Sequence, residues 1–428
     1  MLKNILIIYL VFYSTIFYSQ LRIEIKGGVQ DPVSIAIVPL KWDTEHSQRV
    51  YIHKVIQSDL ESFGEFKVLP PENMLSLPVV KEEVFYKDWR MLGVDYLVIG
   101  SISSKEIKDE IIAEYIIFDV IRERALHRGS VIGPIQTLRQ IGHRISDKIY
   151  SRIQGIPGIF STKIAYIDKP SEVDPNYNLR ISDLDGYDSL SLFSSPQPLM
   201  SPSWSPDREN IAYVSFEEGT SRIFLQKLTT AERRGLKLEM GINSSPDWSP
   251  NGNKISAVLS KSGNPDIFTY DLKTDKWTQL TKHFGIDTEP DWSPDSKKIL
   301  FTSNRSGSPQ IYEANLRNNR IKRLTFEGTY NARGRYLPNG KGFVFVHRRN
   351  GVFHIATQTL KTGKIRILTD TFLDESPTVS PNGNVIIYAT KDEDKDTLAG
   401  ITIDGKTKFI MSSIKGEARE PAWSPLID

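Results

Sequence analysis

The hydrophobic and polar positions of this chain change their spacing near residue 155. Before that point, short apolar runs typical of strands alternate with longer stretches typical of helices. After it, β-branched and aromatic residues fall in short period-2 patches between turns rich in proline, asparagine, aspartate and glycine. The pattern predicts an α/β domain followed by an all-β domain.

The first domain is expected to cover residues 33–154. Alternating strands and helices over this length indicate one compact α/β unit. Gly155-Ile156-Pro157-Gly158 then interrupts the pattern, and we interpret residues 155–162 as the linker. The strands are expected at 33–39, 66–69, 96–100 and 111–120, and the helices at 48–63 and 136–153.

A short segment built around an aromatic residue and a proline returns six times in the second half of the chain. The central residues are 44, 44, 44, 43 and 44 positions apart: Trp204, Trp248, Trp292, Tyr336, Val379 and Trp423. A WD-like repeat of this period, with short strands and tight turns, is typical of a four-stranded propeller blade. Because Tyr336 and Val379 replace tryptophan in two copies, we interpret these side chains as packing residues between blades.

The two ends of the repeat region complement each other. Residues 163–167 match the second strand of a blade with no first strand before them, whereas residues 420–425 match a first strand with nothing after them. Joining them gives a closed ring without free sheet edges. The sequence therefore predicts a six-bladed β-propeller over residues 163–428, closed by the C-terminal strand.

The beginning of the chain has the plan of an export signal. Lys3 precedes an apolar run from Ile5 to Phe17, so residues 1–19 are expected to be a signal peptide, with an uncleaved anchor as the alternative. Apolar and polar residues then alternate in residues 20–32, which we call the arm. The arm is expected either to form an edge strand of its own domain or to add as a strand to a partner's sheet.

Composition and motifs favour a binding protein over an enzyme. The formal net charge is +2, which gives no strong field for nucleic acid, and the chain has no cysteine. There is no Gly-x-Ser-x-Gly elbow, no His-Glu-x-x-His pair and no phosphate loop. We expect no catalytic residues, no cofactor and no metal site.

Polar residues precede the repeated segment in several copies. Glu289, Glu375 and Glu420 are carboxylates, and Ser201 and Ser245 are their polar counterparts. Since all of them precede an innermost strand, they are expected to ring one mouth of the central channel. A partner-docking rim is the favoured interpretation, with turn capping, glycosidase-type acid/base chemistry or a cation site as alternatives.

Several strings of residues give the chain a family resemblance. They include the arm residues 21–25, the string Ser-Ser-Pro-Gln-Pro-Leu-Met-Ser-Pro-Ser-Trp-Ser-Pro-Asp at 194–207, the string Thr-Phe-Leu-Asp-Glu-Ser-Pro at 371–377, and Pro-Ala-Trp-Ser-Pro at 421–425. With these, the chain resembles the TolB family of the Tol-Pal system over essentially its whole length. The strings at 194–207 and 371–377 are the most diagnostic, because each occurs once.

The resemblance implies a non-catalytic periplasmic adaptor that links the lipoprotein Pal to the inner-membrane TolA complex. It would support outer-membrane integrity and outer-membrane invagination during cell division. The alternative is a periplasmic propeller hydrolase or small-ligand-binding protein. After signal cleavage we expect no stable membrane insertion, no nucleic-acid partner, and a monomer outside its complexes.

The resemblance also implies two contact surfaces. The Pal-binding residues on the propeller would be Asn243, Ser245, Thr288, Glu289, Asn331 and Ala332. The residues that bind the TolA C-terminal domain would be Gln20, Leu21, Arg22, Ile23, Glu24, Ile25, Lys26 and Gly27.

Overall fold

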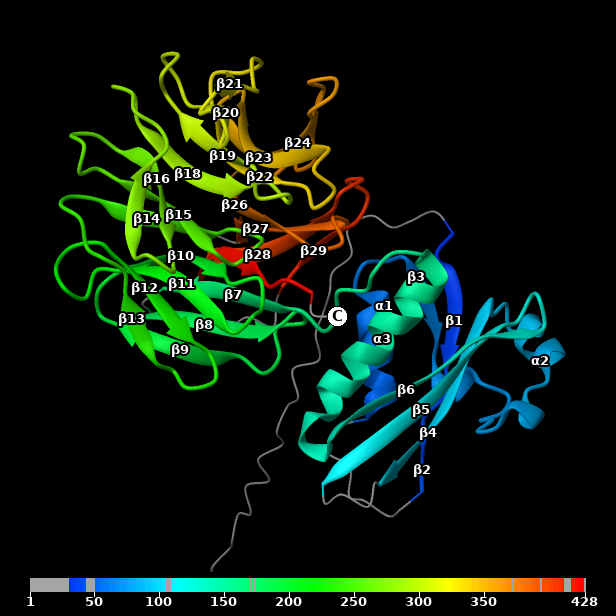
Figure 1. Ribbon diagram of the computed structural model, residues 1–428. Coiled ribbons are helices and arrows are strands. Elements are labelled where there is room, and N and C mark those ends of the chain that lie inside the picture. Colours follow the sequence, from blue (N-terminus) through cyan, green and yellow to red (C-terminus); the bar gives the residue numbers. More distant parts are fainter. Residues whose placement is uncertain are drawn as a thin grey trace, which may run out of the picture.

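The computed structural model describes residues 31–43, 51–104, 109–169, 171, 174–371, 373–392, 395–411 and 417–426. The expected signal peptide and residues 20–30 of the expected arm lie outside the described residues. Figure 1 shows a mixed α/β part beside a ring of small sheets. This is the predicted fold class.

A mixed sheet forms the α/β part, in the order β3-β1-β4-β5-β6, with β2 also paired to β4. The pairs of β1 with β3 and with β4 are parallel, and β4, β5 and β6 are antiparallel to one another. The strands are β1 (Val33–Ile37), β2 (Lys41–Trp42), β3 (Phe66–Leu69), β4 (Tyr96–Ser104), β5 (Glu110–Asp119) and β6 (Arg124–Pro134).

Two helices cover one face of this sheet, on the side of the propeller (Figure 1). In α1 (Ile52–Glu61) the buried residues recur at helical spacing, which orients one apolar face toward the sheet. The longer α3 (Leu138–Gln154) ends at Gly155, whose φ of 76° is the left-handed conformation that terminates helices. The short α2 (Tyr86–Met91) lies at the far end of the domain, away from the propeller.

The second part contains six four-stranded sheets among the described residues. We number these blades in chain order, with the closing blade last. Blades 1 to 3 are β10 (Leu199–Trp204), β11 (Asn210–Ser215), β12 (Arg222–Lys227) and β13 (Arg233–Gly235); β14 (Asn243–Trp248), β15 (Lys254–Leu259), β16 (Asp266–Asp271) and β17 (Lys276–Gln279); and β18 (Asp287–Trp292), β19 (Lys298–Ser303), β20 (Gln310–Asn315) and β21 (Ile321–Arg323).

Blades 4 to 6 repeat this plan. They are β22 (Asn331–Tyr336), β23 (Gly342–Arg349), β24 (Val352–Thr359) and β25 (Ile365–Ile367); β26 (Glu375–Val379), β27 (Val385–Asp392), β28 (Lys395–Thr402) and β29 (Lys408–Ile410); and β30 (Ala418–Trp423), β7 (Lys163–Asp168), β8 (Tyr177–Asp183) and β9 (Leu190–Ser195).

The predicted closure of the ring is confirmed. In blade 6 the C-terminal strand β30 pairs antiparallel with β7, and Trp423 lies opposite Ile164. The Ser424 hydroxyl accepts a hydrogen bond from the Lys163 N–H at 2.9 Å, across 261 positions of the sequence. The Trp423 indole is buried and donates to the Thr162 hydroxyl at 2.8 Å, so the closing strand is anchored by its side chains as well as its ladder.

An apolar core joins the two parts of the molecule. Phe63 follows α1 and lies with its ring centroid 5.6 Å from both Phe160 and Phe409. Phe160 precedes the first propeller strand, and Phe409 lies on β29 of blade 5. Residues 155–162 are therefore held by both parts: the Asp147 carboxylate of α3 accepts the N–H groups of Phe160 and Ser161 at 2.6 and 3.2 Å.

A buried charge cluster crosses the same interface. His143 of α3 lies between Asp59 of α1, with 2.8 Å from Nδ1 to Oδ2, and Asp183 of β8, with 3.6 Å from Nε2 to Oδ2. Arg139 also pairs with Asp185, and Lys163 with Asp183. Burial disfavours charge on the imidazole, but the carboxylates of Asp59 and Asp183 more than offset it and raise the pKa of His143 to about 10.

We expect this cluster to make stability depend on pH. Because the pKa of His143 rises from 6.5 to about 10 on folding, its contribution is fully present below 6.5 and is lost as the pH rises toward 10. His143→Gln leaves buried carboxylates uncompensated and should cost about 3–5 kcal/mol near neutral pH. Calorimetry at about pH 6 and about pH 10 should show that the difference in melting temperature between wild type and variant is smaller at the higher pH.

The control for this experiment is His53→Gln. His53 is half-buried, and its pKa is lowered by burial and by the nearby Lys54 rather than raised. The difference in melting temperature between His53→Gln and wild type should not become smaller between about pH 6 and about pH 10. If His143→Gln lowers the melting temperature by the same amount at both pH values, His143 is not charged in the folded protein.

Candidate functional site

Each innermost strand of the propeller carries one irregularity at the same place. Its pairing with the second strand shifts register in all six blades. The first residue of each shift has a left-handed φ between 49° and 56° and lines a channel cavity of about 420 Å³. We call these residues the channel ring: Ser201, Ser245, Glu289, Arg333, Ser376 and Glu420.

Ring members bond from one blade to the next. The Glu289 carboxylate accepts the N–H of Arg333 at 2.9 Å and lies 3.1 Å from its Nε. In the same way, the Glu420 carboxylate accepts the N–H of Ser201. Arg333 also donates to the Ser376 hydroxyl at 2.6 Å and lies 3.9 Å from Glu420. The guanidinium therefore spans the mouth of the channel between two glutamates.

The sequence identified only part of this ring. Ser201, Ser245, Glu289 and Glu420 lie at the expected mouth, but Glu375 is one residue out of step and pairs with Ala389. Ser376 occupies the ring position in its place. Arg333 was missed, although the repeat spacing pointed to it: counting 44 positions on from Glu289 reaches Arg333.

A second set of side chains forms hydrogen bonds between neighbouring blades, deeper in the channel. The residue before the repeated aromatic accepts the backbone N–H of the next blade's aromatic residue, as in Asp247 to Trp292 at 3.0 Å and Asp291 to Tyr336 at 2.7 Å. Burial, followed by the Asp247 carboxylate, raises the pKa of Asp291 to about 7. These carboxylates bond to the protein's own backbone, which gives them a structural role.

The six expected Pal-binding residues divide into two groups. Ser245, Thr288 and Glu289 are partly exposed and line the channel cavity. Asn243, Asn331 and Ala332 are buried. Asn243 donates to the carbonyl groups of residues 239 and 241, at 2.8 and 3.0 Å, so it braces the loop beneath the mouth.

Large exposed apolar side chains precede the innermost strands of blades 2, 3 and 4. They lie in the segments that lead into β14, β18 and β22, a few residues before the ring positions. Phe284 is 88% exposed, Met240 86% and Phe326 72%, which is unusual for side chains of this size. We call these side chains the apolar rim: Met240, Ile242, Phe284, Ile286 and Phe326.

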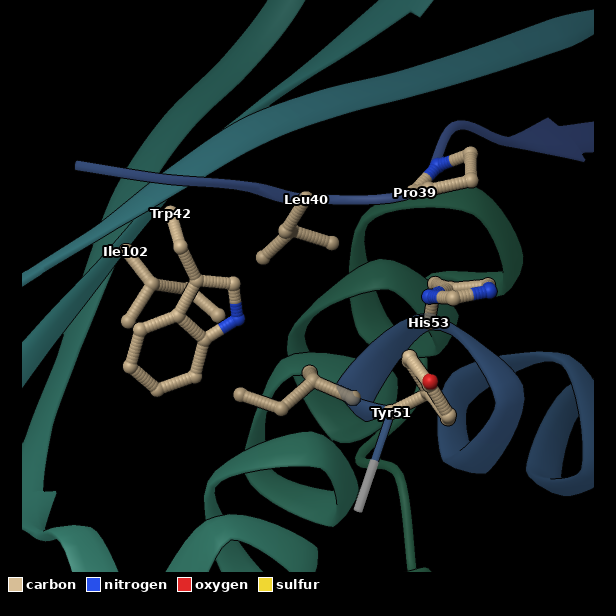
Figure 2. Close-up of a pocket in the computed structure, with 7 residues that line it drawn as sticks. Pro39, Leu40, Trp42, Tyr51, His53 and Ile102 are labelled. Carbon is tan, nitrogen blue, oxygen red and sulfur yellow. The ribbon is translucent and has the colours of Figure 1, made fainter. Parts of the chain in front are cut away.

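The α/β part has a separate cavity of about 310 Å³. Figure 2 shows Trp42 and Ile102 on one side of it and Tyr51 and His53 on the other, with Leu40 between them. Residues 44–50, which connect two of its walls, lie outside the described residues. The lining holds no nucleophile–base pair, so it gives no support to a hydrolase.

One group of metal-ligand types occurs among the described residues, formed by Asp59, His143 and Asp185. It coincides with the charge cluster between the two parts. Arg139 already pairs with Asp185, and the raised pKa of His143 keeps its ring protonated at neutral pH. These side chains therefore already pair with one another and with Arg139, which accounts for their meeting as an ion-pair cluster.

Comparison with known proteins identifies the family. Residues 150–427 match the TolB beta propeller domain, and residues 21–126 match the TolB amino-terminal domain. The chain belongs to the TolB family. As a member of it, the protein is a non-enzymatic component of the Tol-Pal system, which excludes the hydrolase alternative.

Individual TolB proteins match over nearly their whole length. The chain is 56% identical to the Tol-Pal system protein TolB of a Marinomonas species, over 95% of this chain and 94% of that protein. It is 50% identical to the Alcanivorax borkumensis protein, over 96% and 94%. The crystal structure of TolB from Acinetobacter baumannii superposes with a TM-score of 0.85 at 38% identity, covering 95% of this chain and all of that one.

No helix in the described part of this TolB family member is both long and apolar enough to cross a membrane. The channel ring and the apolar rim together form the most distinctive of the exposed faces described above.

We expect Arg333 and Ser245 to differ sharply in their effect on stability, although both belong to the channel ring. Arg333→Ala removes hydrogen bonds to charged groups and leaves two glutamates unpaired, which should cost about 1.5–3 kcal/mol. The Ser245 side chain makes no hydrogen bond to another described residue, so Ser245→Ala should stay within about 0.5 kcal/mol. Equal melting temperatures for the two variants would show that the ring bonds contribute nothing.

Proposed function

We propose that this protein is a periplasmic adaptor that binds the lipoprotein Pal at the mouth of its propeller channel and TolA through its arm. Membership of the TolB family supports Tol-Pal partners in general. The observation that best supports the propeller face is the apolar rim beside the channel ring. Large apolar side chains gathered on one exposed surface are typical of protein–protein contacts.

The polar and apolar parts of this face have complementary roles in the proposal. Thr288 and Ser245 supply hydrogen-bonding groups at the channel wall, and Phe284 and Met240 supply apolar area around them. Glu289 presents a carboxylate that its bonds to Arg333 and Thr302 hold in place. Asn243 and Asn331 contribute from below by bonding to the carbonyl groups of residues 239, 241 and 327 in the preceding loops, and Ala332 is buried beside them in β22.

A rigid surface of this kind favours affinity, because little conformational freedom is lost when the partner binds. The blade-to-blade bonds of the channel ring restrain Glu289 and Arg333 before any partner arrives. Pal would therefore dock on a preformed face. By linking Pal to the TolA complex, the protein would support outer-membrane integrity and invagination during cell division.

The first test is a titration with Pal. Phe284→Ser removes the most exposed ring of the apolar rim and should weaken Pal binding at least about tenfold, equivalent to about 1.4 kcal/mol. Leu190→Ser is the matched control, since Leu190 is 57% exposed on the outer strand β9 of blade 6. Both variants should melt near the wild-type temperature. Unchanged Pal affinity for Phe284→Ser would reject this face as the docking surface.

The second test concerns the arm. Deletion of residues 20–30 leaves all the described strands in place, so it should abolish binding of the TolA C-terminal domain while Pal affinity and melting are retained. Calorimetric titration with TolA and Pal separates the two contacts. Retained TolA binding would rule out strand addition by the arm, whereas loss of folding would support an edge strand of its own domain.

A further inference from the structure

We propose that the outer edge of β6 is a second docking site, which accepts an acidic, extended segment of a partner protein by strand addition. β6 is the last strand of the α/β sheet, and no described strand pairs with its outer side. It is 11 residues long, which is ample for a strand-addition site. This inference concerns a surface of the α/β part, whereas the proposed Pal contact lies on the propeller.

The hydrogen-bond pattern shows which backbone groups of β6 point outward. Ile135 donates its N–H to the Asp109 carbonyl, in line with the β5–β6 register. Hydrogen-bonded pairs alternate along an antiparallel ladder, so the odd-numbered residues of β6 from His127 to Gly133 face β5, up to the register shift that precedes His127. The neighbouring β4–β5 ladder agrees. Val120 donates its N–H to the Asp95 carbonyl, so the backbone groups of the even-numbered residues of β5 face β4 and those of the odd-numbered residues face β6.

The N–H and C=O groups of Arg128, Ser130 and Ile132 therefore point away from the sheet. Within the described part of the chain they have no hydrogen-bond partner. Pro134, which has no N–H, ends this stretch. An unpaired edge of this length is a template for another strand, and proteins normally block such edges or use them.

Basic groups flank the edge on both faces. Arg128 is exposed on the open face of the sheet, while Lys148 and Arg152 are exposed on α3, which covers the other face. Burial, and then Arg152 and Lys148, lower the pKa of His127 on β6, which shows that these two cations lie near the edge. No ion pair joins any of these three cations to a carboxylate among the described residues.

The charge pattern identifies the chemistry of the partner. Successive side chains of an added strand point to opposite faces of the sheet. Carboxylates at adjacent positions would then meet Arg128 on one face and Lys148 or Arg152 on the other. Glu114, opposite Ser130 on β5, makes no ion pair with Arg128 and leaves that cation available. An acidic strand is complementary to this edge, and a basic one is repelled.

The test uses the full mature chain and a labelled ten-residue probe of valine, threonine and four glutamates, two on each face. Fluorescence anisotropy should show binding that weakens with salt. A peptide with lysine in place of glutamate should not bind. Ser130→Pro removes an outward N–H without removing a β5 bond and should weaken binding at least about tenfold. Ser130→Ala keeps the N–H and should stay within about twofold of wild type.

A second variant covers the case in which Ser130→Pro fails to fold. Arg128→Glu combined with Arg152→Glu keeps every backbone group and should also abolish binding of the acidic probe, with Pal affinity unchanged. No binding by wild type, or equal binding by Ser130→Pro, would overturn the proposal. Vesicles of anionic phosphatidylglycerol test whether the basic surface binds lipid instead. If Ser130→Pro still binds the vesicles and the Arg128→Glu, Arg152→Glu variant does not, the basic surface is a lipid-binding site and the proposal is overturned.

Discussion

The pairing of β30 with β7 is the constraint on which the rest of the propeller depends. A strand from the far end of the chain completes a blade that begins at residue 163, so all six sheets are placed around one axis. Closure brings the innermost strand of every blade to the same depth. The repeated left-handed residue of each strand consequently falls on a single ring at the channel mouth.

The contacts between blades stabilise the propeller and also hold in place the side chains that are exposed at the channel mouth. Glu289 and Arg333 connect blades 3 and 4, and Arg333 reaches on to Ser376 in blade 5. Below them, Asp247 and Asp291 bond to backbone groups of the following blade. A residue that shapes the docking face can therefore also stabilise the fold, whereas Phe284 and Met240 are exposed and free of that second role.

Much of the architecture could be predicted because it repeats. The spacing of Trp204, Trp248 and Trp292 predicted the blades, and the unmatched segments at 163–167 and 420–425 predicted the closure. Local sequence also placed α3, where apolar periodicity and Gly155 agree. The ring position of Ser376 is also contained in the repeat, because each ring residue lies three positions before the repeated central residue, here Val379. The prediction instead followed the carboxylate of Glu375, and a one-residue difference decides which side chain faces the channel.

Long-range charge pairing was not visible in the sequence. His143 and Asp59 are 84 positions apart, and Asp183 belongs to the other part of the molecule. Their meeting depends on how α1 and α3 pack against blade 6, which no local pattern encodes. The sequence likewise left β6 unassigned, and its free edge became evident only from the order of strands in the sheet.

The left-handed residues of the channel ring have a cost that the rest of the propeller must offset. For a residue with a Cβ atom this conformation is disfavoured by about 1–2 kcal/mol, and glycine would remove most of that penalty. All six positions nevertheless bear side chains. At Glu289, Arg333 and Glu420 the side-chain bonds to neighbouring blades offset this penalty. At Ser245 no such bond does, so folding free energy alone would favour glycine there, at the loss of a polar group from the channel mouth.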